Sequence, residues 1–179
     1  RSTLPITPEL AAKYYFDDSY GPGDVRAHLL VMGANPDIVV DAWVRNHYKW
    51  VVWKLALVDL YNIQSNMLPS LRYDSVKDVI YGRYEKEYVK GKKSFLKGVL
   101  QRDTPSVLPC ILKVASVQKV PNPSSLYRLE LTDGWYSIFC DCDEALSNLV
   151  HRHDIYIGKK LRISHAELVG GSAGEPLDA

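Results

Sequence analysis

Residues 46–54 read "NHYKWVVWK", and this stretch carries two of the four tryptophans of the chain beside two lysines. Aromatic rings among basic side chains are typical of surfaces that bind nucleic acid, where bases stack on the rings and cations follow the phosphates. The same residue types also occur in helices that are buried in a hydrophobic core. The sequence on either side decides between these interpretations.

The stretch lies in a segment with helical periodicity, which we expect to begin at Asn35 and to end at about Tyr61. Asn35 suits the N-cap position and Pro36 the first helical position. At about 100° per residue, the apolar and aromatic residues fill one stripe and the sector beside it: Val39, Trp43, Trp50, Leu57 and Tyr61, then Val40, Val44, Val51, Leu55 and Val58. Because most of the circumference is apolar, Trp43 and Trp50 are predicted to face a core.

Trp53 lies about 60° from Trp50 around the same helix, on the side of Lys49. We therefore expect Trp53 at the boundary between core and solvent, with Lys49 and Lys54 beside it. A role in binding therefore stays open for the residues at this edge of the helix, whereas the central stripe is interpreted as core.

Three further helices are predicted before Pro105, at residues 24–32, 73–88 and 89–102. The last is basic and amphipathic, with an inward side formed by Phe95, Leu96, Val99 and Leu100. Residues 83–102 contain seven basic side chains against two acidic ones: Arg83, Lys86, Lys90, Lys92, Lys93, Lys97 and Arg102. These cations form either a solvated helix face or a surface that binds an anionic partner.

After Pro105 the pattern changes to strands, at residues 108–120, 125–133, 135–141 and 158–170. Asp133-Gly134 is a strong hairpin signal, and residues 143–153 predict a helix capped by Asp143 or Asp141. The order of three strands, a helix and a strand is that of the oligonucleotide/oligosaccharide-binding (OB) barrel. No fifth strand is apparent after Gly170, so the barrel is either cut short or closed by something outside this chain.

We thus expect an α+β chain with an all-α helical domain at residues 1–104 and an OB-fold barrel at residues 105–179. No apolar run approaches the roughly 20 residues that a membrane span needs, and no motif of a nucleotide-binding or catalytic site occurs. We expect neither an enzyme nor a cofactor. The three cysteines, Cys110, Cys140 and Cys142, lack metal or disulfide spacing and indicate a reducing compartment. Residues 151–154, "HRHD", are interpreted as a polar helix end rather than a metal site.

OB barrels bind single strands through aromatic side chains and cations on their strands. The candidates for contact with nucleic acid are Lys113 on the first strand, Tyr127 and Arg128 on the second, and Trp135, Tyr136 and Phe139 on the third. Because side chains alternate between the two faces of a strand, at most about half of them can line one groove. Packing in the core remains the alternative for each.

Four segments together carry a resemblance to a known family. They are residues 41–56 "DAWVRNHYKWVVWKLA", 81–88 "YGRYEKEY", 129–138 "LELTDGWYSI" and 158–170 "GKKLRISHAELVG". In this order and at similar spacing they resemble the DNA-binding region of the breast cancer type 2 susceptibility protein family. The resemblance covers most of residues 6–178. The first segment and "LTDGWY" are specific, whereas "HAELVG" is common to OB folds of single-strand-binding proteins.

The resemblance implies a helical domain followed by the first of several OB domains, in a nuclear protein that loads a RecA-type recombinase on single-stranded DNA during homologous recombination. The recombinase would bind regions outside this chain. The helical domain and first OB fold would dock a small, acidic, disordered partner, the split-hand/split-foot deletion protein. In relatives the later OB domains, absent here, are the stronger DNA binders, and the fifth strand would follow residue 179.

For an acidic, disordered partner we expect binding residues that combine cations with aromatic anchors. They are Lys49, Trp53, Lys54, Lys92, Lys93, Lys97 and Trp135. The expected nucleic-acid contacts are Lys113, Tyr127, Arg128, Tyr136 and Phe139. Asp133 is assigned to the turn, as a structural residue. Three functions stay open, namely a fragment of a recombination mediator that docks the acidic partner, a stand-alone single-strand-binding module, and a structural docking domain without DNA binding.

Overall fold

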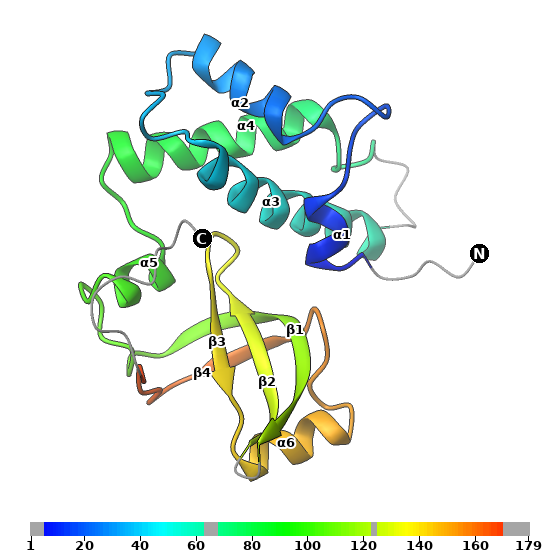
Figure 1. The fold of residues 1–179 in the computed structure, drawn as a ribbon, viewed down its shortest axis with the longest axis vertical. Coiled ribbons are helices and arrows are strands. Elements are labelled where there is room, and N and C mark those ends of the chain that lie inside the picture. Colours follow the sequence, from blue (N-terminus) through cyan, green and yellow to red (C-terminus); the bar gives the residue numbers. More distant parts are fainter. Residues whose placement is uncertain (1–5, 63–67, 123–124, 170–179) are drawn as a thin grey trace. The chain divides into compact units, whose positions relative to one another are not determined.

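The computed structural model describes residues 6–62, 68–122 and 125–169 (Figure 1). The chain divides into two compact units between Lys93 and Ser94, which is earlier than the expected domain boundary after residue 104. Among the described helices, none combines the length and the apolar character needed to cross a membrane.

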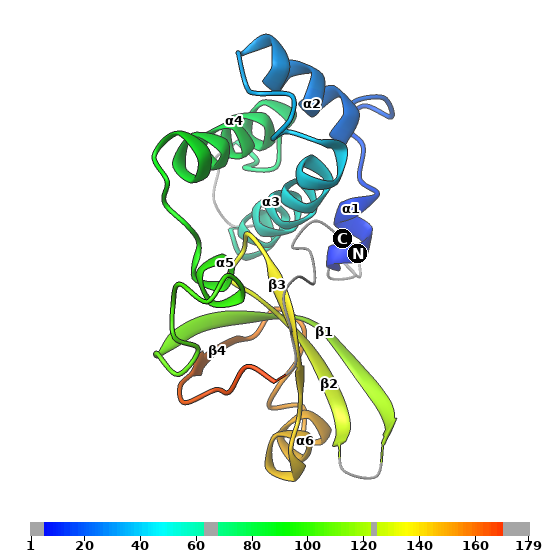
Figure 2. The ribbon, with the colours of Figure 1, turned by 60° about the vertical axis from the view of Figure 1, so that its left-hand side comes forward.

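The helical unit is organised around one long helix, α3 (Asp41–Tyr61). Three shorter helices contact it, namely α1 (Pro8–Ala12), α2 (Pro22–Val31) and α4 (Tyr73–Tyr84). α4 continues directly into a turn of π-helix, η1 (Glu85–Val89). Figures 1 and 2 show α3 running between these neighbours, as the apolar circumference of its sequence requires.

The start of α3 differs from the prediction, whereas its end at Tyr61 is confirmed. Asn35 caps only an isolated turn: its side-chain Oδ1 accepts a hydrogen bond from the Asp37 N–H at 2.9 Å, and its carbonyl accepts one from Val39 at 3.0 Å. Val40 then adopts an extended conformation, with φ −65° and ψ 161°. The capping signal at Asn35 is therefore genuine, but the helix begins six residues later, at Asp41.

All three tryptophans of α3 are buried. Trp43 and Trp50 are 2% and 1% exposed, which confirms that they face the core. The expected boundary position of Trp53 is wrong, because its side chain is only 2% exposed. Its indole N–H donates to the backbone carbonyl of Ile6 at 2.8 Å, and α1 packs against α3. The aromatic rings of residues 46–54 thus belong to the core.

The core of the helical unit also contains polar side chains, His47 and Arg83, which are 0% and 5% exposed. Arg83 Nη1 lies 3.1 Å from His47 Nδ1. Because a guanidinium group can only donate, Nδ1 of His47 must accept, so the imidazole is neutral and carries its proton on Nε2. This contact fixes the tautomer of His47 and joins α4 to α3. The ring of His47 in turn packs on Trp43, with centroids 4.2 Å apart.

The predicted helix at residues 89–102 is largely absent. The π-helix η1 ends at Val89, and Gly91 turns the chain with a φ of +62°. A new helix, α5 (Phe95–Leu100), begins only after Ser94, whose hydroxyl accepts from the Lys97 N–H. The lysines at positions 90, 92 and 93 therefore lie on a non-helical connecting segment rather than on one face of a helix.

The second unit contains the predicted order of three strands, a helix and a strand. Its elements are β1 (Cys110–Asn122), β2 (Ser125–Thr132), β3 (Ser137–Asp141), α6 (Glu144–His151) and β4 (Lys160–Ile163), with α5 preceding them. The strands form one antiparallel sheet in the order β3-β2-β1-β4. Within the described residues the sheet is not closed. The segment after Gly170, where no fifth strand was apparent, lies outside them.

The last strand is shorter than the predicted residues 158–170. β4 pairs with β1 through only four residues, from Lys160 opposite Lys113 to Ile163 opposite Cys110. The backbone then turns at His165, which has a φ of +58°, and its N–H donates to the carbonyl of Val107 at 3.0 Å. The backbone bond to Val107 therefore replaces continued pairing with β1.

One face of the sheet carries the core of the second unit, which α6 helps to cover. The buried side chains are Leu96, Leu112, Val114, Leu129, Leu131, Tyr136, Cys142, Val150 and Ile155. Asp143 caps α6, since its Oδ1 accepts from the Leu146 N–H at 2.8 Å. Leu96 belongs to α5, which explains why this short helix is part of the second unit rather than of the helical one.

Asp133 holds the turn between β2 and β3 with its carboxylate. Oδ1 accepts from the backbone N–H groups of Trp135 and Tyr136 at 2.8 and 2.9 Å, and Oδ2 accepts from Leu96 N–H at 2.9 Å. Gly134 follows with a φ of +90°, a conformation that suits glycine. The turn and the start of α5 are thus joined through one side chain.

We predict that Trp43→Ala lowers the free energy of unfolding of the helical unit by about 3–5 kcal/mol, because it leaves a large cavity. The indole N–H of Trp43 is buried and has no hydrogen-bond partner among the described residues. Trp43→Phe keeps most of the ring and removes that unpaired donor, so it should cost less than half as much. Guanidinium denaturation followed by circular dichroism at 222 nm measures both, and a loss below about 1 kcal/mol for Trp43→Ala would contradict the assignment to the core.

We also predict that Asp133→Ala destabilises the second unit by about 2–3 kcal/mol, because it leaves three backbone donors without their charged acceptor. Asp133→Asn retains an acceptor oxygen for the turn and should cost less. Hydrogen exchange at Leu96, Trp135 and Tyr136 provides the local measurement. Unchanged protection of all three amides in Asp133→Ala would show that the carboxylate does not hold this turn.

Candidate partner and nucleic-acid interface

The face of the sheet opposite the core, called here the outer face, is defined by the strand register. Residues directly opposite each other in an antiparallel pair point to the same side. Arg128 is opposite Asp141 and Glu130 is opposite Phe139, while Leu129 and its partner Cys140 lie on the core side. The outer face therefore combines residues from all four strands, in two areas of different charge.

The charge-balanced area covers β2 and β3 and consists of Arg128, Glu130, Phe139 and Asp141. Arg128 Nε lies 2.6 Å from Asp141 Oδ1, and this hydrogen bond holds the pKa of Asp141 below its usual range and that of Arg128 above it. Glu130 accepts a hydrogen bond from the Ser137 hydroxyl at 2.7 Å. Phe139 remains 57% exposed. The area thus offers one open aromatic ring, but its only arginine is already paired with a carboxylate.

The basic area covers the paired ends of β1 and β4 and consists of Ile111, Lys113, Lys160 and Arg162. Lys113 is opposite Lys160, and Ile111 is opposite Arg162, so the four side chains share the outer face. Ile111 is 67% exposed, and Lys160 and Arg162 are also exposed. Three cations around an exposed apolar side chain give this area the chemistry to contact an anion with apolar parts.

The sequence analysis named Lys113 but missed Lys160 and Arg162. A signal for them was present in "GKKLRI", where the two cations alternate with Leu161 and Ile163. Alternation alone places Lys160 and Arg162 on one side of a strand. It could not show that β4 would pair with the start of β1 and bring them beside Lys113.

Two of the other predicted nucleic-acid contacts lie on the core side. Tyr136 is 2% exposed and is part of the core, so its predicted role as a stacking platform is wrong. Tyr127 is half-buried against the same core, and its hydroxyl lies 3.3 Å from His151 Nδ1 on α6. Arg128, Phe139 and Lys113 are on the outer face, although in different areas.

The predicted partner-binding residues are divided between the two units. Trp53 is buried in the helical unit, while Lys54 on the same helix is exposed. Lys49 is half-buried, with its Nζ 4.2 Å from the centroid of the Trp50 ring. Lys92 and Lys93 are exposed on the connecting segment that ends the helical unit.

Lys97 and Trp135 belong to the second unit and are both half-buried. Lys97 Nζ lies 5.6 Å from the centroid of the Tyr136 ring. Trp135 packs against the core of the sheet. Their apolar contacts hold both side chains in place, so each offers only part of its surface to a ligand.

The cysteines and the histidines near α6 show no features of a metal centre. Burial raises the pKa of Cys142 to about 11 and also raises that of Cys140, which keeps both thiols protonated and poor metal ligands. His151 and His153 are exposed at the end of α6, where Arg152 pairs with Asp154 at 3.3 Å. Among the described residues, no group of three or more metal-binding side chains comes together.

Comparison with known families assigns each unit. Residues 22–90 match the family model described as "BRCA2, helical", and residues 94–179 match the one described as "BRCA2, oligonucleotide/oligosaccharide-binding, domain 1". The two matches meet where the chain divides into its compact units. The sequence of a helical domain followed by an OB-fold domain is therefore confirmed, with a sheet that is open within the described residues.

Two curated proteins of Arabidopsis thaliana are similar to almost the whole chain. They are the BREAST CANCER SUSCEPTIBILITY 2 homologs A and B, each 32% identical over 185 residues that cover 94% of this chain. The chain spans only 16% of the length of either relative. By both of its domains and by this similarity, the chain belongs to the BRCA2 family, of which it represents the helical domain and the first OB domain.

Proposed function

We propose that this chain is the part of a nuclear recombination mediator that docks a small acidic partner, the split-hand/split-foot deletion protein, and contributes to binding of single-stranded DNA in double-strand break repair. Membership of the BRCA2 family carries the proposal, because it assigns both domains to a DNA-repair protein. The arrangement of charge on the described surface supports it. The chain would act by binding, and the recombinase would be engaged by other parts of the protein.

The DNA contribution is assigned to the basic area of the outer face. Lys113, Lys160 and Arg162 lie together on the paired ends of β1 and β4, and cations that track the backbone supply most of the affinity for a single strand. The charge-balanced area adds the exposed ring of Phe139, on which one base can stack. Because Arg128 is neutralised by Asp141 there, we expect DNA binding by this chain to be weak.

The ion pair between Arg128 and Asp141 also favours the function of a mediator fragment over that of a stand-alone single-strand-binding module. An OB module that binds tightly by itself needs several unpaired cations and stacked aromatics on one continuous surface. Here Tyr136 is in the core, and the cations of the basic area lie on different strands from Phe139. The tighter DNA contacts would come from further domains.

Docking of the acidic partner is assigned to the end of the helical unit. Lys90, Lys92 and Lys93 are exposed on a non-helical segment, next to Val89, which is 68% exposed. A disordered acidic chain loses conformational entropy when it binds, so it needs apolar contacts in addition to charge attraction. This segment offers both, because exposed lysines and the exposed Val89 side chain follow one another in it.

We predict that the chain binds oligothymidine with a slope of log affinity against log salt of about −2, as three neutralised phosphates imply. Affinity should then fall roughly 20-fold between 50 and 200 mM salt. Lys160→Glu combined with Arg162→Glu should remove most of the binding and of this slope. Fluorescence anisotropy with a labelled oligothymidine measures both quantities.

The matched control reverses two exposed lysines of the helical unit, Lys13→Glu with Lys54→Glu. This control should bind oligothymidine like the unmodified chain. If the two double variants lose affinity equally, general charge rather than the basic area governs binding, and the assignment is wrong.

We further predict that Lys92→Glu with Lys93→Glu lowers the affinity for the acidic partner about tenfold, mainly through slower association. Surface plasmon resonance with the partner immobilised separates the association and dissociation rates. Lys13→Glu with Lys119→Glu makes the same change in net charge at exposed sites elsewhere and serves as the control. Equal affinities of the Lys92/Lys93 variant and the unmodified chain would contradict this docking site.

A further inference from the structure

A second surface of the helical unit surrounds the short hairpin of residues 16–20. Its charge is opposite to that of the lysine segment, which is the non-helical segment with Lys90, Lys92 and Lys93. The hairpin closes through two backbone hydrogen bonds, from Phe16 N–H to the Tyr20 carbonyl at 2.8 Å and from Tyr20 N–H to the Phe16 carbonyl at 2.9 Å. Asp17 and Asp18 form its tip with φ values of 49° and 56°. Asparagine and aspartate are the non-glycine residues that best tolerate this conformation.

The hairpin holds a cluster of aromatic rings in place. Tyr14 packs edge-on against Phe16 with centroids 4.9 Å apart, and Tyr20 packs against Tyr73 of α4 at 5.3 Å. Phe16 also meets Tyr73 at 5.9 Å, which joins both pairs into one cluster. Phe16 is 9% exposed, whereas Tyr14 and Tyr20 are 37% and 47% exposed. Tyr14 and Tyr20 are therefore partly exposed while neighbouring rings hold them in place, so little side-chain entropy remains to be lost on binding.

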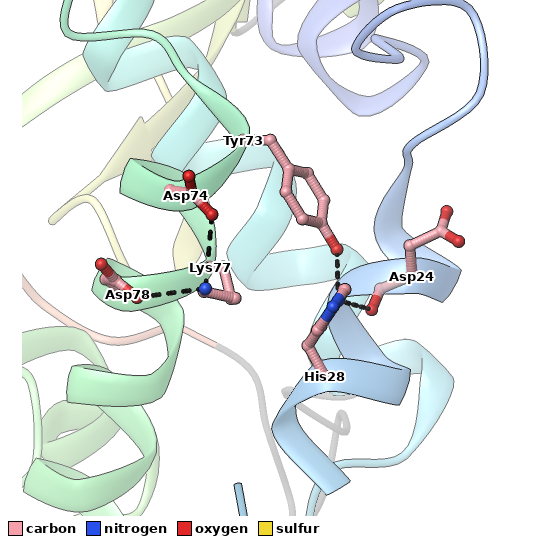
Figure 3. Close-up of polar contacts among 6 residues, drawn as sticks. All are labelled: Asp24, His28, Tyr73, Asp74, Lys77 and Asp78. Atoms are coloured by element: carbon pink, nitrogen blue, oxygen red, sulfur yellow. Dashed lines mark hydrogen bonds and ion pairs between the residues drawn. The ribbon is translucent and has the colours of Figure 1, made fainter. Parts of the chain in front are cut away.

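His28 of α2 orients the Tyr73 side chain from the other direction. Figure 3 shows Tyr73 pointing from α4 toward α2, where its hydroxyl lies 2.8 Å from His28 Nδ1. The same nitrogen lies 3.0 Å from the backbone carbonyl of Asp24. α2 and α4 thus fix the central ring of the cluster through a polar contact at its edge.

The electrostatic environment of Tyr73, the central ring of the cluster, is negative. Asp17 and Asp18 are exposed and form no ion pair with any described residue. Lys77 of α4 is already paired with Asp74 at 3.3 Å and with Asp78 at 3.7 Å (Figure 3). Burial raises the pKa of Tyr73 to about 12, and the negative charges of Asp24 and Asp74 contribute to the rise.

We propose that the hairpin surface, formed by Tyr14, Asp17, Asp18, Tyr20 and Tyr73, docks an arginine-rich peptide segment of another protein. Planar guanidinium groups stack on aromatic faces and pair with carboxylates, so one arginine can use both features of the surface. A lysine ammonium is more strongly hydrated and gains less from the rings. The negative charge disfavours nucleic acid. This surface would operate independently of the sites proposed above for DNA and for the acidic partner.

The test uses a fluorescein-labelled octapeptide of alternating arginine and glycine, titrated with the full chain at 100 mM salt and followed by anisotropy. Asp17→Asn with Asp18→Asn removes the two charges and preserves the turn, because asparagine also adopts left-handed backbone conformations. We expect this variant to lose about fivefold in affinity, as the loss of two exposed ion pairs implies. Tyr20→Ala should lose a similar factor through the lost stacking.

The matched control, Asp37→Asn with Glu144→Gln, makes the same change in net charge at exposed positions in other segments of the chain. It should bind the peptide like the unmodified chain, and the lysine-glycine peptide should bind more weakly than the arginine-glycine one. Equal affinity in the two double variants, or no preference for arginine, would overturn the proposal. Concentration-dependent dimerisation that Asp17→Asn/Asp18→Asn abolishes would instead identify a second copy of this chain as the occupant.

Discussion

Three indole rings on one helix impose the main constraint on the helical unit. Trp43, Trp50 and Trp53 span about 80° of the circumference of α3, and all three are buried. α1, α2 and α4 each contact α3, and the N-terminal segment accepts the Trp53 N–H at Ile6. Because the long helix is enclosed in this way, its sequence motif serves packing. The exposed charges and rings to which we assign binding lie on the segments around it, namely the lysine segment and the hairpin surface.

In the OB unit the corresponding constraint is the strand register. Pairing places Arg128 opposite Asp141 and Lys113 opposite Lys160, which separates the outer face into a charge-balanced and a basic area. The turn that begins β3 depends on the Asp133 carboxylate, which also holds the start of α5. The unit therefore keeps an OB architecture in which the basic area, to which we assign the contact with DNA, is separate from the exposed ring of Phe139.

Much of this organisation was predictable where the pattern is local. The hairpin at Asp133-Gly134, the cap at Asp143 and the burial of Trp43 and Trp50 follow from turn chemistry, capping and helical periodicity. The errors arose where two local signals competed. Asn35 caps a turn that Val40 ends at once, and the basic helix at residues 89–102 is interrupted at Gly91, where the backbone is left-handed.

By itself the sequence determined the two-domain class, the order of the elements and the family, because periodicity, turns and motif spacing are properties of neighbouring residues. Only the tertiary structure decided which side chains remain available to a ligand. Trp53 is covered by Ile6 from 47 positions earlier, Tyr136 turns into the core, and Lys160 meets Lys113 across β1 and β4. Exposure and charge pairing depend on contacts between residues far apart in the chain, and local patterns carry no information about which distant segment will provide them.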